Sequence, residues 1–357
     1  MRISQVTVTA IATDVLKALG ASTDTADSVI HSLLEADRRN CKTHGLSLMP
    51  LYADLIEAGI IEPRSTPEVQ EISRCLARVD GHRAFGQLAA QQAVEQGLKM
   101  LPQEGIAAVS IIDGTHLGRL GQWAEYACRH GAAFLAFTNT AGGARNVAGP
   151  GSSERVLSTN PIALGVPTFG ALQRHVVVDF ASSQVSGSRI REVHNAGGKL
   201  DPDWTVAEDG GTTDDPEAFL SGAAALLPLG GRTAGHKGFG LMVASEMLAA
   251  LGGSMMAGER DEPGFSNGAL FCFIDVKRFV EPAEWGERAR HFSEYLAELG
   301  YRLPGTGKVT SADEDSEELE IAEHILGALI DLASTLNVDT RDIRGASPRR
   351  GAVRQTW

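Results

Sequence analysis

Three of the ten histidines stand in short, glycine-bounded turns, where a side chain is well placed for proton transfer. Histidines in turns between secondary-structure elements are good acid–base candidates, because the backbone presents the ring at the edge of a cleft. These turns are Thr43-His44-Gly45, Thr115-His116-Leu117-Gly118 and Gly235-His236-Lys237-Gly238. No HxxxH or HExxH spacing accompanies them, so the pattern favours acid–base chemistry over a metal site.

His44 and His116 differ in the local structure that we expect around them. His44 falls just before, or in, the first turn of a predicted helix, where the partial positive charge of the helix end disfavours protonation of the ring. A neutral imidazole can accept a proton. His116 follows a predicted strand in an H-x-G-x-x-G run, and Gly118 and Gly121 would allow backbone or ligand to approach closely.

The usual nucleotide-binding and hydrolase motifs are missing. There is no GxGxxG between a strand and a helix, no GxxxxGK[ST] and no GxSxG. The segment Gly235-His236-Lys237-Gly238 is expected to open a helix after a glycine-rich loop over 230–238. A lysine, bare amides and a helix N-terminus together could hold a phosphate. The alternative, a loop lysine in water, stays open on this motif alone.

The elements that must position these residues alternate in type. Apolar, β-branched runs predict strands over 106–112, 133–139, 175–181 and 269–275. Helical spacing of apolar residues predicts helices near both termini, with Ser22 or Thr23 as one N-cap, and a strongly apolar helix over 238–251. This order predicts an α/β core wrapped by a helical domain that both termini build.

Composition narrows the function classes. The chain has 357 residues, 43% hydrophobic and 22% charged, and a formal net charge of −13, the wrong sign for general nucleic-acid binding. No stretch approaches the ~20 apolar residues needed to cross a bilayer. Four scattered cysteines form no CxxC pair, so we expect a reduced, cytoplasmic protein. The acidic run 311–320 predicts a solvated loop, and the basic end 344–357 predicts a tail or a subunit-clasping arm.

Nine segments in chain order resemble one family, the type-2 malate/L-lactate dehydrogenases, which include ureidoglycolate, sulfolactate and diketogulonate oxidoreductases. They are ADRRNCKTHGLSLMPLY (36–52), RVDGHRAFGQ (78–87), DGTHLGRLG (113–121), FTNT (137–140), LSTNPIALGVPT (157–168), VVDFASS (177–183), LLPLGGRTAGHKGFGL (226–241), FCFIDVKRF (271–279) and RLPG (302–305). The resemblance implies a family-specific, non-Rossmann NAD(P)-binding fold, which agrees with the missing fingerprint. It also implies a homodimer.

The implied activity is hydride transfer between NAD or NADP and a small 2-hydroxy or 2-keto acid, or a related cyclic imino acid. By matched position, His116 resembles the family's acid–base residue, with His44 beside it. The positions matching cofactor contacts are Thr140, Asn160, Asp179, Phe180, Ala181, His236 and Lys237. The expected division is a helical domain (1–75 with 283–357), a small α/β domain (76–130) and a cofactor-binding domain (131–282).

One position departs from the family pattern. Relatives commonly read HGVSR after the histidine, but this chain has Leu48 where the arginine stands, and leucine cannot hold a carboxylate. The loop 141–155 is also longer than usual. Three explanations stay open: another group holds the carboxylate, the substrate lacks a carboxylate there, or activity is lost. Candidate substrate-binding residues are Thr43, Arg119 and Arg145, with Lys42 as a further cation.

Three functions therefore compete. The first is an active NAD(P)-dependent oxidoreductase, supported by the matching histidines, Thr140, Asp179 and Lys237. The second is a non-catalytic protein on the same fold, which Leu48 favours. The third is a non-redox enzyme that reuses the two histidines.

Overall fold

The structure is a computed structural model that describes residues 2–259, 266–305 and 317–341. The chain divides into two compact units, residues 1–56 with 309–357, and residues 57–308. Both termini thus contribute to the first unit, as the sequence predicts. The basic end 344–357 and most of the acidic run 311–320 lie outside the described residues.

The first unit is mostly helical. Ser22 caps its second helix, accepting a hydrogen bond from the backbone N–H of Thr25 (3.2 Å), which confirms one of the two predicted caps. A two-stranded antiparallel sheet joins its beginning to its end, with Ile3 opposite Leu319. Its elements are β1 (Arg2–Ser4), α1 (Gln5–Ala18), α2 (Thr23–Arg38), the 3-10 turns η1 (Lys42–His44) and η2 (Leu46–Leu48), α3 (Met49–Glu57), β13 (Glu318–Glu320) and α11 (Glu323–Thr335).

The second unit is built on a mixed seven-stranded sheet in the order β2-β3-β4-β12-β5-β8-β9. The four predicted strands are confirmed as β4, β5, β9 and β12. Phe271 and Phe273 of β12 pack edge-on against Phe134 of β5, with ring centroids 5.2 Å apart in both pairs. The strands are β2 (Glu68–Glu71), β3 (Leu76–Asp80), β4 (Ile106–Gly114), β5 (Ala132–Asn139), β8 (Ile162–Val166), β9 (Val176–Phe180) and β12 (Asn267–Asp275).

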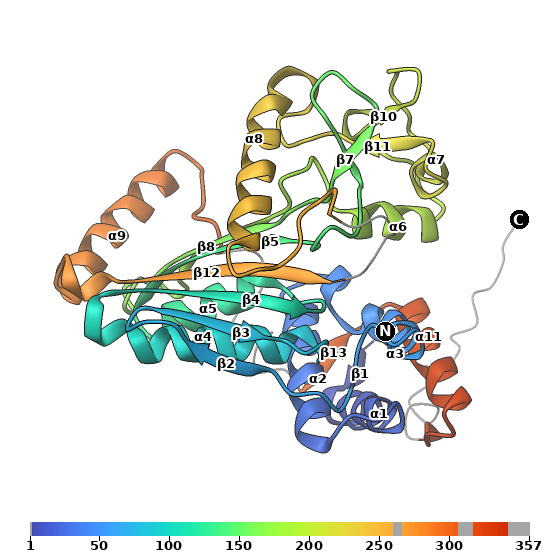
Figure 1. The fold of residues 1–357 in the computed structure, drawn as a ribbon, viewed down its shortest axis with the longest axis horizontal. Coiled ribbons are helices and arrows are strands. Elements are labelled where there is room, and N and C mark those ends of the chain that lie inside the picture. The colour runs from blue at the N-terminus through green and yellow to red at the C-terminus, as the bar shows by residue number, and fades with distance from the viewer. Residues whose placement is uncertain (1, 260–265, 306–316, 342–357) are drawn as a thin grey trace, which may run out of the picture. The chain divides into compact units, whose positions relative to one another are not determined.

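Helices cover both faces of this sheet. Figure 1 shows α4 (Gly86–Glu104) and α5 (Leu120–Arg129) on one face and α8 (Gly231–Ala250) on the other. A smaller sheet, in the order β10-β11-β6-β7, lies in the same unit. The remaining elements are β6 (Val147–Ala148), β7 (Arg155–Leu157), α6 (Gly187–Asn195), η3 (Pro202–Trp204), β10 (Thr205–Ala207), α7 (Pro216–Leu220), β11 (Ala224–Leu226), η4 (Val276–Arg278) and α9 (Pro282–Glu298).

The predicted glycine-rich loop over 230–238 is wrong. Helix α8 already begins at Gly231, with one non-helical residue, Ala234 (φ −127°, ψ 15°), inside it. Gly238 lies so close to the backbone of Leu229 that any side chain there would overlap with it. Gly238 therefore allows the helix to pack tightly against the turn that follows β11, and it lies within the helix instead of a loop.

The predicted three-domain division differs from the two compact units. One sheet contains strands from both 76–130 and 131–282, because β12 lies between β4 and β5. Helix α9 belongs to the second unit, where the indole N–H of Trp285 donates to the carbonyl of Pro167 (2.8 Å). The division into three parts stays a prediction.

Candidate active site

His116 lies in the turn 115–119 that joins β4 to α5, as the sequence predicts. The hydroxyl of Thr115 donates to the carbonyl of Ala84 (2.8 Å) and accepts from the N–H of Gly86 (2.9 Å). A side chain at Gly86 would come within 2.5 Å of the carbonyl oxygen of His116. The turn is therefore fixed against the start of α4, and its half-buried imidazole stands on a rigid support.

The end of the same turn is held by an ion pair. The guanidinium of Arg119 donates to Glu125 (2.9 Å), and the two side chains are only 7% and 17% exposed. The indole N–H of Trp123 donates to the carbonyl of Leu117 (2.9 Å). The charge of Arg119 is thus matched inside the fold, which supports a structural role; its role in substrate binding stays a prediction.

Asp179 joins the cofactor-matching strand β9 to the helix that follows His116. Its carboxylate accepts a hydrogen bond from the backbone N–H of Gly121 (2.7 Å), in the first turn of α5, where negative charge is favoured. A side chain on Gly121 would overlap with the guanidinium of Arg119 and lie 3.1 Å from this carboxylate. Gly121 therefore permits the close approach that the H-x-G-x-x-G run suggested. Phe180 and Ala181, which are half-buried, follow directly.

Thr140 follows the last residue of β5. Its hydroxyl lies 3.4 Å from the carbonyl of Ala144, within a turn that contains Ala141 at a positive φ of 46°. Asn139, fully buried, shapes this turn, because its Oδ1 accepts from the N–H of Ala141 and of Gly268, both at 3.1 Å. The position of Thr140 thus depends on the orientation of the neighbouring amide.

Asn160 is also fully buried, at a positive φ of 31°. Its amide nitrogen donates to the carbonyl of Met242 (3.0 Å) and to Glu246 (2.7 Å) on α8. Its Oδ1 has no hydrogen-bond partner in the part of the chain that the structure describes. The hydroxyl of Ser182, just after Ala181, is shared between the carbonyls of Thr159 (2.7 Å) and Asn160 (3.0 Å).

Sequence reasoning missed Glu246 and Ser245. They occupy the centre of the predicted apolar helix, and both are buried against the end of β5. A serine and an acid at adjacent positions within GFGLMVASEMLAAL were a usable signal, because an acid is rarely buried without a partner. Glu246 ties α8 to the turns that carry Thr140 and Asn160, whereas Ser245 ties it to Thr138 within β5.

His236 and Lys237 are exposed on α8. His236 lines a cavity of about 510 Å³ together with Arg232 and the loops 149–153 and 208–210. The guanidinium of Arg232 donates to the carbonyls of Gly210 (3.1 Å) and Gly211 (2.8 Å). Arg232 and the N-terminus of α8 suit a phosphate group, while the carboxylates of Glu208 and Asp209, which also line the cavity, oppose one. Lys237 is not among the residues that line this cavity.

The first unit carries Thr43 and His44, on the 3-10 turn η1. The hydroxyl of Thr43 lies 3.1 Å from Nδ1 of His44. The predicted helix begins only at Met49, five residues after His44. The prediction that the positive end of this helix keeps His44 neutral is therefore wrong, because His44 is not in its first turn. Pro50 is the second residue of that helix, where the missing N–H of proline has no intrahelical acceptor to lose. His44 and His116 belong to different units, and their convergence stays a prediction.

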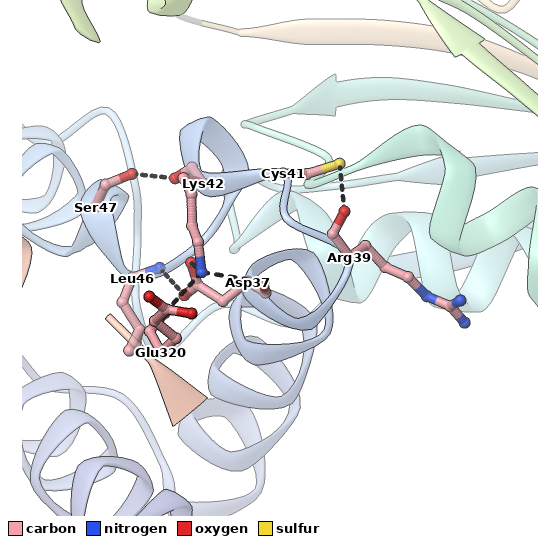
Figure 2. A network of polar contacts seen from close by, with 7 residues as sticks. All are labelled: Asp37, Arg39, Cys41, Lys42, Leu46, Ser47 and Glu320. Atoms are coloured by element: carbon pink, nitrogen blue, oxygen red, sulfur yellow. Dashed lines mark hydrogen bonds and ion pairs between the residues drawn. The ribbon is translucent and has the colours of Figure 1, made fainter. Parts of the chain in front are cut away.

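Asp37 organises the segment around His44. Figure 2 shows its buried carboxylate accepting from the N–H of Leu46 (2.9 Å), with the ammonium of Lys42 3.7 Å away. Lys42 also donates to the carbonyls of Asp37 (3.2 Å) and Glu320 (2.9 Å). Burial raises the pKa of Asp37, against the opposing effects of the Leu46 hydrogen bond and Lys42. Lys42 is therefore occupied within its own unit.

Arg145 differs from the other two candidate cations. It is exposed in the turn between β5 and β6, and no hydrogen bond or ion pair holds its guanidinium among residues 2–259, 266–305 and 317–341. Leu48, at the position of the expected arginine, is half-buried in η2. Of the three cations, Arg145 is the one whose charge the described fold leaves unmatched.

The sequence model of the malate/L-lactate dehydrogenase family matches residues 3–330. The chain belongs to this family. An L-sulfolactate dehydrogenase of Methanothermobacter thermautotrophicus is 26% identical over 95% of this chain and 98% of its own. A delta(1)-pyrroline-2-carboxylate reductase of Ancylobacter novellus is 33% identical over 70% of both chains. The predicted family and the class of enzyme, a dehydrogenase or reductase, are confirmed.

The fold is that of the family as well. The crystal structure of a delta1-piperideine-2-carboxylate reductase from Pseudomonas syringae pvar. tomato superimposes with a TM-score of 0.81 at 25% identity, covering 93% of this chain and all of that one. The predicted family-specific α/β fold is thus confirmed. Across the described ranges, no cluster of three metal-binding side chains occurs, and no helix is long and apolar enough to span a membrane.

Proposed function

We propose that this protein is an NAD- or NADP-dependent oxidoreductase that acts on a small 2-hydroxy or 2-keto acid, or on a related cyclic imino acid. The observation that carries the proposal is the hydrogen bond from Gly121 to Asp179. It joins the turn of the proposed acid–base residue, His116, to the strand of the proposed cofactor residues, although 58 positions separate its two ends.

His116 is the proposed acid–base residue. A bound nicotinamide supplies the hydride acceptor, while the imidazole of His116 removes the proton from the substrate hydroxyl, or returns it in the reducing direction. Such proton transfer contributes about 10²–10⁴-fold to a rate, and the fixed turn supplies part of the positioning. His44, with Thr43 beside it, is the second proposed histidine of the site.

The residues of the second unit fit a nicotinamide cofactor. A buried, unpartnered acceptor on Asn160 and an exposed Asp179 provide polar groups, and a separate cavity of about 510 Å³ at the start of α8, lined by His236 alone of the assigned residues, provides space for part of a dinucleotide. We assign the cofactor to Thr140, Asn160, Asp179, Phe180, Ala181, His236 and Lys237. Whether it is NAD or NADP is decided by the binding assay below.

Arg145 is the proposed partner of the substrate carboxylate. Leucine at position 48 cannot bind an anion, while Lys42 and Arg119 are held by Asp37 and Glu125. Arg145 lies five residues after Thr140, in the turn between β5 and β6. The relatives that act on sulfolactate or on pyrroline-2-carboxylate, as they are named, support an anionic substrate.

The proposed assembly is a homodimer in the cytoplasm, without nucleic-acid or membrane partners. The net charge of −13 supports the absence of nucleic acid, and the four cysteines, all thiols, support a reducing compartment. Light scattering of the purified protein measures the dimer directly.

The decisive experiment combines binding with turnover. Purified protein is titrated with NADH and NADPH, and then assayed against a panel of 2-keto and cyclic imino acids. We expect binding of one cofactor, turnover of one substrate class, and a loss of kcat of about 10²-fold or more in His116→Asn. His291→Asn, an exposed histidine on α9, is the matched control and should keep parent activity.

Two results would contradict the proposal. Cofactor binding without turnover of any panel member would favour a non-catalytic protein, the alternative that Leu48 supports. Product formation without a nicotinamide would indicate a non-redox enzyme.

A further inference from the structure

The centre of α8 carries a carboxylate inside the protein. Glu246 is 6% exposed and accepts three hydrogen bonds: from the side-chain amide of Asn139 (3.2 Å), from the N–H of Ala257 (2.8 Å) and from the side-chain amide of Asn160 (2.7 Å). In the part of the chain that the structure describes, these three donors are all uncharged amides. Only neutral donors satisfy the carboxylate.

Two acceptors leave the side-chain amide of Asn160 a single orientation. Both hydrogens of its amide nitrogen are used, one by Glu246 and one by the carbonyl of Met242. A rotated amide would place an oxygen against these two acceptors. Glu246 and the Met242 carbonyl together fix which end of the Asn160 amide is the donor, and they hold the unpartnered Oδ1 on the opposite side.

The same carboxylate acts on the turn of Thr140. Asn139 donates to Glu246 and to the carbonyl of Met255 (2.9 Å), so its Oδ1 is directed to the N–H groups of Ala141 and Gly268. Ala141 and Asn160 both have a positive φ, which non-glycine residues rarely adopt. Strained residues persist where the surroundings fix them, and they cluster at ligand sites.

We propose that Glu246 is a positioning residue of the cofactor site. Acting through the amides of Asn139 and Asn160, its carboxylate fixes two strained turns, 139–141 and 158–161, in the form that binds the nicotinamide cofactor. The inference rests on the proposed function, because Thr140 and Asn160 are cofactor residues only there.

Glu246→Gln tests this, since it keeps the volume and removes one acceptor. If the glutamine oxygen keeps Asn139 and Ala257, its NH₂ group faces the amide nitrogen of Asn160, donor against donor. The Asn160 amide must then rotate, or its turn must shift. We expect NADH or NADPH, whichever the parent binds, to bind at least about 10-fold more weakly, which corresponds to about 1.4 kcal/mol.

Ser245→Ala is the matched control. Ser245 is the neighbouring residue, fully buried, and its hydroxyl contacts the backbone N–H (3.2 Å) and carbonyl (3.1 Å) of Thr138. Within the described ranges, the hydroxyl of Ser245 bonds to Thr138 and to neither asparagine. We expect this variant to lose thermal stability to an extent similar to Glu246→Gln, while its cofactor Kd stays within about twofold of the parent.

The readouts separate positioning from stability. Cofactor Kd is measured by fluorescence titration and thermal melting by circular dichroism. The KM for the cofactor, and kcat at saturating cofactor, are measured with the substrate found for the parent. We expect KM to rise and kcat to change little. If Glu246→Gln does not fold, Glu246→Asp, which keeps the charge but shortens the reach, should weaken binding about threefold or more.

Three outcomes overturn the inference. The first is parent-like cofactor affinity in Glu246→Gln or, where that variant does not fold, in Glu246→Asp. The second is equal weakening in Ser245→Ala. The third is failure of both Glu246 variants to fold, which makes the residue purely structural. If the parent protein itself binds neither NADH nor NADPH, it is the proposed function that fails.

Discussion

Gly45→Ala should destabilise the helical unit, because the new methyl group would occupy the place of the Asp37 carboxylate. A Cβ at this position overlaps with all three carboxyl atoms of Asp37. The Asp37 side chain is only 2% exposed, so it has no open space into which to move. The carboxylate must leave its position, and its hydrogen bond to Leu46 breaks.

The magnitude follows from two contacts. The 2.9 Å bond from the Leu46 N–H to a charged acceptor contributes about 1.5–3 kcal/mol, and overpacking adds about 1–3 kcal/mol. The attraction to Lys42 at 3.7 Å adds little, because that side chain is partly exposed. We therefore expect a loss of roughly 2–4 kcal/mol, with partial relaxation included.

Gly327→Ala is the control: it is also a glycine-to-alanine change, but it should raise the free energy of unfolding instead of lowering it. Gly327 lies inside α11 of the same unit, and a Cβ there meets no atom within 4 Å. Alanine in a helix interior is more favourable than glycine by about 0.5–1 kcal/mol. Urea unfolding by circular dichroism measures both variants, and hydrogen exchange over 37–48 localises the effect. Parent-like unfolding and exchange in Gly45→Ala would refute the steric argument.

The remaining predictions concern pH and the substrate. Burial raises the pKa of Asp37, so the free energy of unfolding should fall as pH rises from 3.8 through the raised pKa. Asp37→Asn should flatten this decline, which urea unfolding at several pH values measures. The pKa of His175 is lowered, chiefly by burial and then by the charge of Arg129, while Glu125 opposes the shift. The folded protein therefore loses stability as pH falls below 6.5, because the unfolded chain binds the proton more readily. His175→Gln should reduce this loss. Leu48→Arg should gain activity on malate- or lactate-like acids in steady-state assays, whereas an unchanged substrate profile would assign specificity to the loop 141–155.

Much of the fold was predictable from local pattern. The strand runs 106–112 and 269–275, the Ser22 cap and the strand–turn–helix around His116 depend on neighbouring residues, so apolar spacing and turn residues predicted them. The glycines of 230–238 misled, because Gly238 is needed where α8 packs closely against Leu229, in the turn before the helix. In the sequence, a glycine-rich stretch that forms a loop looks the same as one that lets a helix pack closely against its neighbour.

The sequence by itself determined the family, the α/β class and the candidate histidines, since these depend on residue types in order. Tertiary structure alone decided that Arg119 is paired with Glu125, that Lys42 is held by Asp37, and that Glu246 joins the turns of Asn139 and Asn160. The physical reason is that a polar side chain is defined by the groups that satisfy it. For Glu246 two of the three groups come from residues 107 and 86 positions away along the chain, which no local spacing reveals.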